Sequence, residues 1–475
     1  MKKIFLRVSF FAFTVSLLIS SAYAKGKPQL VLGVMGDVHV RGSITNEVVP
    51  LHFSQEKMRK ILMEFRRRNV DGVICTGDIA DLGTDADYQA LSKVWFDVFP
   101  DNRRLDGEKV EKLFVYGDHD VLKMWKNTPE NKAKRAELWQ RTWKEPYQRF
   151  VRKEVKGFVF LGAHFENDGY SGGEFAHWLT KEVSKLDREK PFFFAQHRHL
   201  TDTCFSPFGG DICGGGIVST AILSTRPNAI AFSGHSHYSL TDDTAFWRGS
   251  FTSVATGAAA FNVGIRRGRE NGDADSKEIK SMGVLRTGLD DLHPLMMQGM
   301  IVSVFETHVE FERFDFGFSE PLGTKWVVPR PFVAVDPKVD FLERKKLAAK
   351  DRLVFKQGKV TAKYVMGKNR KGEDEGQILV AFPTATAKNG NRVLDYEISI
   401  SSIHKDWIRQ RAVKRIHASD FYLPLGHEKE EEICLFSLAE LGLTTRIVTR
   451  IDVKAIDSYG NVHTGVAGTV FLDVK

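Results

Sequence analysis

Five short segments of this 475-residue chain combine aspartate and histidine side chains in a way that suits metal chemistry. Each segment follows an apolar run that is typical of a buried strand. In α/β sheets, ligands bind beyond the carboxyl ends of the strands, so the segments should converge. Carboxylate and imidazole groups together suit divalent manganese, iron or zinc. The segments are Gly36-Asp37-Val38-His39, Gly77-Asp78-Ile79-Ala80-Asp81, Gly117-Asp118-His119-Asp120, Gln196-His197 and Gly234-His235-Ser236-His237.

The elements that would position these segments alternate between strand-like and helix-like patterns. This alternation predicts an α/β layered domain, and the later apolar runs at 300–305 and 309–314 predict a hairpin. The composition, 42% hydrophobic and 27% charged, is that of a globular protein and excludes a mostly disordered or collagen-like chain. Strands are expected at 30–35, 70–76, 110–116, 155–161, 191–195 and 229–232, and helices at 54–68, 85–99 and 129–150.

In their order and spacing, the five segments resemble the calcineurin-like metallophosphoesterase superfamily, from about residue 30 to 237. The resemblance implies a four-layer α/β/β/α sandwich with two divalent metal ions and a metal-bridging hydroxide that attacks a phosphate ester. His119 would be a catalytic histidine that is not a ligand. By position, the first ion would be held by Asp37, His39 and His237, the second by Asp118, His197 and His235, and both by Asp78.

Several positions in and beside these motifs raise separate expectations. Asp118 stands where the family usually has asparagine, and the extra negative charge should alter metal preference while activity survives. Purple acid phosphatases carry a tyrosine ligand where this chain has Asp81, so a tyrosinate–iron(III) site is not expected. Asp81 and Asp120 are expected to orient histidines, with turn and capping roles as an equal alternative. Arg198 is a candidate for contact with substrate phosphate, and surface placement is its alternative.

The first 24 residues predict a cleaved signal peptide, with a basic start, an apolar run and cleavage after Ala24. The expected protein is therefore secreted or periplasmic, with no further stretch long enough to cross a membrane. Loss of three basic residues lowers the net charge from +8 to +5, and no basic run predicts a nucleic-acid partner. Cys204 and Cys213 are expected to form a disulfide, while Cys75 and Cys434 are expected to be buried thiols.

Three regions are expected after the signal peptide: a catalytic domain at 25–323, a linker at 324–344 that is extended as far as residue 336, and a β-sandwich at 345–475. The last region weakly resembles immunoglobulin-like or fibronectin type III sandwiches through its strand spacing, and structural support is its expected role. The expected function is that of an exported two-metal phosphoric ester hydrolase, with monoesters and diesters both open. The alternative is a catalytically degenerate binding protein that acts through its β-sandwich.

Overall fold

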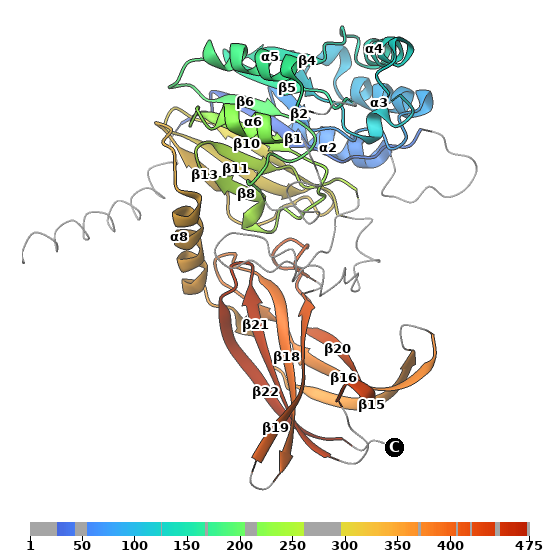
Figure 1. Ribbon diagram of the computed structural model, residues 1–475, viewed down its shortest axis with the longest axis vertical. Helices are drawn as coiled ribbons and strands as arrows, with labels where there is room; N and C mark the ends of the chain where they lie inside the picture. Colours follow the sequence, from blue (N-terminus) through green and yellow to red (C-terminus); the bar gives the residue numbers. More distant parts are fainter. Residues whose placement is uncertain are drawn as a thin grey trace, which may run out of the picture.

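The computed structural model describes residues 26–42, 55–124, 126–166, 170–204, 216–260, 296–368, 372–404, 407–418, 420–441 and 447–472. An α/β domain is followed by all-β sheets, which confirms the predicted fold class (Figure 1). The predicted signal peptide, Cys213 and the charged insert at 265–276 lie outside the described residues. Within the described ranges, no helix combines the length and apolar character needed to cross a membrane.

The first sheet of the α/β domain has seven strands. They are β1 (Leu30–Met35), β2 (Gly72–Cys75), β3 (Glu111–Phe114), β10 (Gln298–Val304), β11 (His308–Asp315), β12 (Glu320–Pro321) and β13 (Trp326–Pro329). Their order is β12-β11-β10-β1-β2-β3, and β13 pairs with β11. Strands β1, β2 and β3 are parallel, whereas β10 runs antiparallel to β1 and forms the predicted hairpin with β11.

The second sheet has six strands, and its apolar face packs on the first sheet. The strands are β4 (Phe150–Val155), β5 (Phe158–Ala163), β6 (Phe192–Ala195), β7 (Ala229–Ser233), β8 (Phe246–Arg248) and β9 (Thr252–Ala255), in the order β4-β5-β6-β7-β9-β8. Leu32 and Val34 of β1 share one buried cluster with Phe193 of β6 and Phe232 of β7. Burial of these side chains holds the two sheets face to face.

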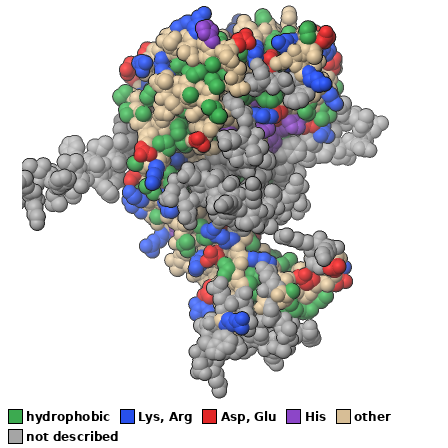
Figure 2. Space-filling model, in the orientation of Figure 1, with side chains coloured by type: hydrophobic (Ala, Val, Ile, Leu, Met, Phe, Trp, Pro, Cys, Tyr) green, Lys and Arg blue, Asp and Glu red, His purple; other side chains and the backbone are tan. Residues whose placement is uncertain are grey.

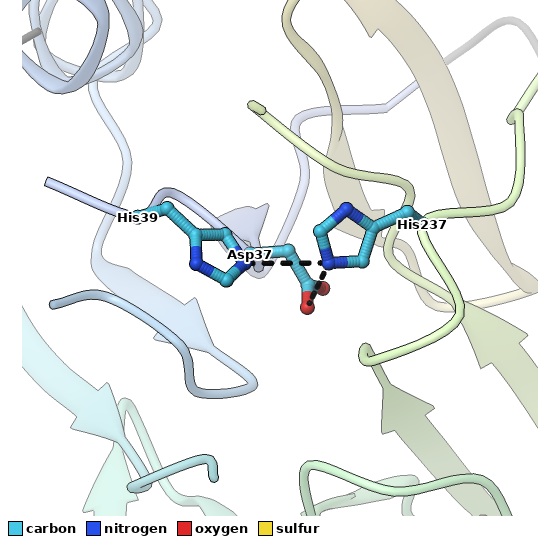
Figure 3. A group of neighbouring side chains, drawn as sticks. All are labelled: Asp37, His39 and His237. Atoms are coloured by element: carbon cyan, nitrogen blue, oxygen red, sulfur yellow. Dashed lines mark hydrogen bonds and ion pairs between the residues drawn. The ribbon is translucent and has the colours of Figure 1, made fainter. Parts of the chain in front are cut away.

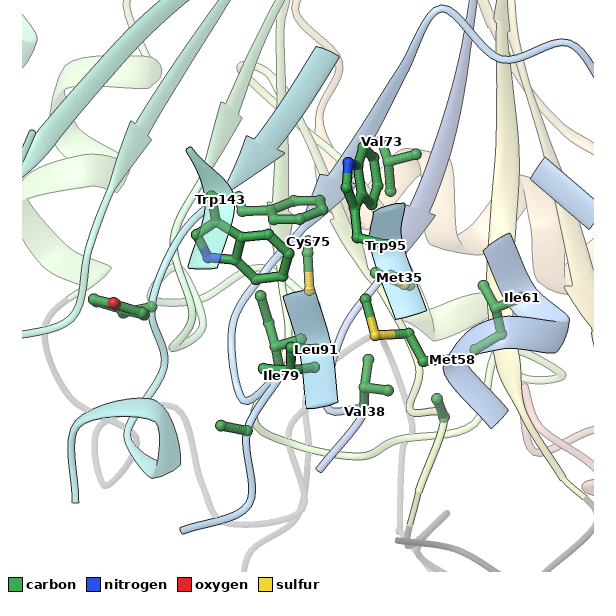
Figure 4. Close-up of a cluster of buried hydrophobic side chains, with 14 of the residues drawn as sticks. Met35, Val38, Met58, Ile61, Val73, Cys75, Ile79, Leu91, Trp95 and Trp143 are labelled. Atoms are coloured by element: carbon green, nitrogen blue, oxygen red, sulfur yellow. The ribbon is translucent and has the colours of Figure 1, made fainter. Parts of the chain in front are cut away.

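Helices cover the outer face of each sheet, so the layers run α/β/β/α. These helices are α2 (Gln55–Arg67), α3 (Asp85–Val98), α4 (Pro129–Trp143), α5 (Gly173–Ser184) and α6 (Gly216–Leu223). Met58 of α2 and Trp95 of α3 pack in one buried cluster with Val73 and Cys75 of β2 (Figure 4). Alternation along β2 explains the layering, because Ile74 points instead into the cluster between the sheets.

The predicted helix at 129–150 and strand at 155–161 are corrected by the structure. Helix α4 ends at Trp143 because Lys144 adopts a left-handed backbone conformation with φ 59°. The chain then forms β4, which pairs with β5 in an antiparallel hairpin around Lys156 and Gly157, both at positive φ. A single strand was expected where two strands meet at a turn.

The segment predicted as a linker, 324–344, forms a strand and the first part of a helix. Its first part forms β13, whose Val328 pairs with Val309 in β11. Helix α8 (Pro337–Lys350) follows and begins after Asp336, whose carboxylate accepts a hydrogen bond from the backbone of Lys338. A proline at the first helical position favours helix initiation, whereas the run of prolines in the sequence had suggested extended chain.

The C-terminal region contains antiparallel sheets around a core of its own. A three-stranded sheet has the order β15-β16-β20, a four-stranded sheet has the order β19-β18-β21-β22, and β14 pairs with β17. Ile378 and Phe436 from the first of these sheets share a buried cluster with Tyr396 and Val453 from the second. The likeness to immunoglobulin or fibronectin domains stays a prediction. The elements are β14 (Val354–Phe355), β15 (Thr361–Lys368), β16 (Asp374–Pro383), β17 (Ala385–Thr386), β18 (Val393–His404), β19 (Trp407–His417), β20 (Glu431–Ser437), α9 (Leu438–Leu441), β21 (Ile447–Asp457) and β22 (Val462–Leu472).

The two regions meet around Asp243, in a short 3-10 helix at Asp243–Ala245. The Asp243 carboxylate accepts hydrogen bonds from Trp326 Nε1 (2.9 Å) and from the Tyr459 hydroxyl (3.0 Å), and it pairs with Arg313 (3.0 Å). Burial opposes ionisation of Asp243, but Arg313 lowers the pKa of this carboxyl below its usual value. Tyr459 belongs to the C-terminal region, so a buried charged network joins the two regions.

Candidate metal centre

The five predicted segments begin one to three residues after the ends of β1, β2, β3, β6 and β7. These strands belong to both sheets of the α/β domain, and the loops after them converge. Histidine side chains gather at one place on the face of this domain shown in Figure 2. Strand ends from two sheets therefore supply the side chains of a single site.

Asp37, His39 and His237 form the first ligand group, with one ligand atom from each within 4.8 Å of the others (Figure 3). His237 Nε2 lies 3.2 Å from Asp37 Oδ1 and 3.3 Å from His39 Nε2. The other ring nitrogen of His39, Nδ1, donates to Asp81 Oδ1 at 3.1 Å, since a carboxylate can only accept. This bond leaves His39 Nε2 directed at the group, so Asp81 orients a histidine, one of the two roles considered for it.

Asp78, His197 and His235 form the second ligand group. His197 Nε2 lies 3.1 Å from Asp78 Oδ2 and 3.2 Å from His235 Nδ1. His197 Nδ1 donates to the carbonyl of Thr76 at 2.9 Å, which leaves Nε2 as the ligand atom. Asp78 Oδ2 also lies 3.8 Å from His39 Nε2. The Asp78 carboxylate therefore stands between the two groups, where a bridging ligand is needed.

His119 lies beside both groups at the start of a short 3-10 helix, His119–Val121. Its backbone N–H donates to Asp78 Oδ1 (2.8 Å), and its ring Nδ1 donates to the carbonyl of Asp81 (2.7 Å). The ring meets that of His39 edge to face at 4.6 Å between centroids. With 40% of its side chain exposed, His119 is more open to solvent than His39 and has Nε2 left for other contacts.

Asp118 lies at the edge of the second group but is closest to an arginine. Its Oδ2 is 4.0 Å from His235 Nδ1, whereas Arg198 Nη2 donates to the same oxygen at 2.5 Å and Arg198 Nε at 3.2 Å. The guanidinium also lies over the ring of Phe165, 4.6 Å from its centroid. The candidate ligand Asp118 and the candidate substrate residue Arg198 are thus paired with each other.

Of the two roles considered for Asp120, its hydrogen bonds within the described residues fit the turn and capping role rather than the orientation of a histidine. Its carboxylate accepts hydrogen bonds from the backbone N–H groups of Ile79 (3.1 Å), Ala80 (2.8 Å) and Gly117 (2.8 Å). Burial raises the pKa of Asp120 to about 7, and the charge of Asp78 adds to this shift. Asp120 therefore joins the second and third segments through their backbones.

The backbone at the site is strained at several candidate ligands. Non-glycine residues at positive φ cost on the order of 1–3 kcal/mol each, and such strain clusters at ligand sites. This strain is a structural sign of function that is independent of the motifs. The positive-φ candidates are Asp37 (51°), His39 (50°), Asp78 (50°), His235 (67°) and His237 (51°).

The charges of the site fit bound cations. Burial disfavours the ionised carboxyls of Asp37 and Asp78, but neighbouring histidines hold the pKa of both groups below the usual value. Burial likewise disfavours charge on His197, but the Asp78 carboxylate raises the pKa of this histidine to about 10. Buried carboxylates that require positive charge, together with four converging imidazoles, are a donor set suited to two divalent ions.

Some supporting residues were not found from the sequence. Arg41 Nε donates to Asp81 Oδ2 at 2.5 Å, and the Tyr170 hydroxyl accepts from the backbone N–H of His197 at 2.9 Å. Neither residue belongs to a motif. The Cys204 thiol donates to the carbonyls of Ala245 (3.1 Å) and Ser253 (3.2 Å). Its disulfide with Cys213 stays a prediction, since Cys213 is not described.

Two solved structures and one family model are similar to parts of this chain. A purple acid phosphatase from yellow lupin seeds is 14% identical, with 64% of this chain and 55% of that chain covered and a TM-score of 0.42. A dimetal phosphatase from Danio rerio is 13% identical, with 64% of this chain and 99% of that chain covered and a TM-score of 0.39. A search of curated protein sequences found no match. Residues 30–239 match the family model of the calcineurin-like phosphoesterases, which spans all five segments. This part of the chain is therefore a calcineurin-like metallophosphoesterase domain.

Proposed function

We propose that the protein is an exported two-metal phosphoric ester hydrolase. The observation that carries this proposal is the pair of ligand groups with Asp78 between them. Two bound divalent ions supply Lewis acidity there, since they polarise a phosphoryl oxygen and lower the pKa of the attacking water. Export rests on the signal-peptide pattern of the first 24 residues.

The residues of this chain would divide the remaining work. Asp37, His39 and His237 would hold one ion, and Asp78, His197 and His235 would hold the other. Hydrogen bonds to Asp81 and to the Thr76 carbonyl fix the rings of His39 and His197 before substrate arrives. Fixed ligands lower the reorganisation that the reaction would otherwise need.

His119 is the proposed proton donor to the departing oxygen of the ester. Its Nδ1 is held by the Asp81 carbonyl, so Nε2 is the atom that can reach substrate. The same position allows a protonated His119 to stabilise negative charge on the phosphoryl group. Its partial exposure fits a residue that meets substrate rather than one that holds an ion.

Hydrolysis of paired chromogenic phosphate mono- and diesters tests the proposal. The mature protein would be stripped of metal and reloaded with Mn²⁺, and turnover is expected only after reloading. The faster ester assigns the subclass. His119→Ala should lower turnover by about 10²- to 10⁴-fold while two ions stay bound. Asp78→Ala should abolish both turnover and binding of the full metal complement.

The matched control is His177→Ala, which removes an exposed histidine on α5 and should leave turnover unchanged. Failure of the wild-type protein to hydrolyse either ester with two ions bound would contradict the proposal. That result would favour the binding-protein alternative.

A further inference from the structure

The contact between Asp118 and Arg198 is a feature that the family resemblance does not supply. Two guanidinium nitrogens, Nε and Nη2, face the carboxylate at 3.2 Å and 2.5 Å from Oδ2. The two side chains are 19% and 27% exposed, so the pair is partly withdrawn from water. A two-nitrogen contact of this kind is among the stronger and more directional ion pairs in proteins.

The arginine is held in place from several sides. Its guanidinium lies over the Phe165 ring, and its backbone carbonyl accepts a hydrogen bond from Gln196 Nε2 at 2.7 Å. Gln196 in turn accepts from Ser219 Oγ at 2.5 Å, in helix α6. Because Arg198 directly follows the ligand His197, its position is tied to that of the second group.

The pairing changes the charge that Asp118 brings to the site. An aspartate in place of the family asparagine adds a third carboxylate to those of Asp37 and Asp78, which disfavours an anionic phosphate. The guanidinium keeps its positive charge at any ordinary pH, so it offsets this addition. The net charge of the Asp118–Arg198 pair is then zero, which is also the charge of an asparagine side chain.

We propose that Asp118 and Arg198 act as one neutral unit in place of the family asparagine. In this unit, Asp118 offers an oxygen to the second ion, and Arg198 cancels the charge that would weaken phosphate binding. The inference rests on the proposed function, since it requires two bound ions. Arg198 is thus a positioning and charge-balancing residue that acts on phosphate through Asp118.

A double-mutant cycle with two binding readouts tests this unit. Arg198→Met should leave three uncompensated carboxylates, so Mn²⁺ binds more tightly and inorganic phosphate about 10-fold more weakly. Asp118→Asn should leave an uncompensated guanidinium, so Mn²⁺ binds about 10-fold more weakly and phosphate no less tightly. The double variant should return both dissociation constants to within about 3-fold of the wild-type values.

Calorimetric titration of Mn²⁺ into stripped protein, and of inorganic phosphate into reloaded protein, gives these constants without a turnover assay. Arg67→Met is the matched control, since Arg67 pairs with Glu64 on α2, away from the site. Arg198→Lys keeps the positive charge and should leave the affinity for phosphate within about 3-fold of the wild-type value. This variant replaces Arg198→Met as the test if Arg198→Met does not fold.

A double variant whose Mn²⁺ dissociation constant stays about 10-fold above the wild-type value would overturn the inference, because the uncompensated guanidinium would then not be the cause of the weaker binding. So would an equal loss of phosphate affinity from Arg198→Met in the wild-type and Asp118→Asn backgrounds, because Arg198 would then bind phosphate directly. Either result, with two ions bound and ester hydrolysis intact in the wild-type protein, leaves the proposed function standing. A wild-type protein that binds no Mn²⁺ would instead contradict the proposed function itself.

Discussion

The two ligand groups use the same kinds of side chain but are supported differently. In the first group His39 is held by the buried Asp81 carboxylate, and His237, the most open of its side chains, is 13% exposed. In the second group His235 is 24% exposed, and the Asp118–Arg198 pair stands at its edge. One histidine ring is fixed in each group, so the difference lies in burial. Deeper burial favours permanent binding, and we expect the first ion to be held more tightly.

Removal of the metals gives the largest contrast between the groups. During titration with a chelator, the ion of the second group should leave first, and the two release steps should be separated by about 10-fold or more in chelator concentration. His39→Ala should remove the tighter step, and His235→Ala the weaker one. Metal analysis after dialysis measures both. Release of the two ions in one step would remove the basis of the comparison.

Loss of Asp81 should act on one group only. Asp81→Ala removes the acceptor that orients His39, and residues in such supporting positions typically contribute about 10- to 100-fold to metal affinity. Calorimetry should therefore show a lower affinity for the first ion and an unchanged affinity for the second ion. Asp97→Ala is the control, because Asp97 is an exposed carboxylate on α3 that pairs with Lys93 and Arg59. Equal weakening of both ions would mean that Asp81 supports the whole site.

The ligand loops could be predicted from the sequence because their signals are local. An apolar strand followed at once by glycine and a ligand is visible within a few residues, as at Gly36-Asp37 and Gly234-His235. The order of the segments then supports the α/β fold. The hairpin of β4 and β5 was missed because a turn at Lys156-Gly157 interrupts what reads as one apolar run.

The supporting contacts could not be predicted because they join residues far apart in the chain. Arg41 and Asp81 are separated by 40 positions, and Asp118 and Arg198 by 80. Only the pairing of β1 with β2, and the meeting of the two sheets, bring these side chains together. The sequence shows an extra charge at Asp118, but not the guanidinium that offsets it.

The buried carboxyl of Asp315, which lies near the buried amine of Lys57, provides a pH test. Lys57 Nζ donates to the carbonyl of Ala259 (2.7 Å), and the backbone N–H of Ala260 donates to the carbonyl of Asp37 (3.1 Å). Nearby, burial raises the pKa of Asp315 to about 7 from an unfolded value near 3.8. The folded protein therefore binds more protons than the unfolded chain between about pH 4 and 7, and this contribution to stability decreases as pH rises.

Asp315→Asn should flatten that slope, which for one proton is at most about 1.4 kcal/mol per pH unit. Urea denaturation of metal-free wild type and variant at pH 5 and pH 7 measures the difference. Asparagine keeps the oxygen that accepts from the backbone of Gly317 at 2.8 Å, so the fold should be retained. An identical slope in both proteins would show that Asp315 titrates normally.

The smallest expected effect tests what the groups share. The loop after β7 carries His235 for one group and His237 for the other, and it continues to Asp243, which accepts from the Tyr459 hydroxyl. Tyr459→Phe removes one hydrogen bond to a charged carboxylate and should lower the free energy of unfolding by about 1.5–3 kcal/mol. Because this loop serves both groups, any loss of Mn²⁺ affinity should be small and equal for the two ions. Tyr364→Phe, on β15, is the control. A loss confined to one ion would mean that the C-terminal region acts on the two groups separately.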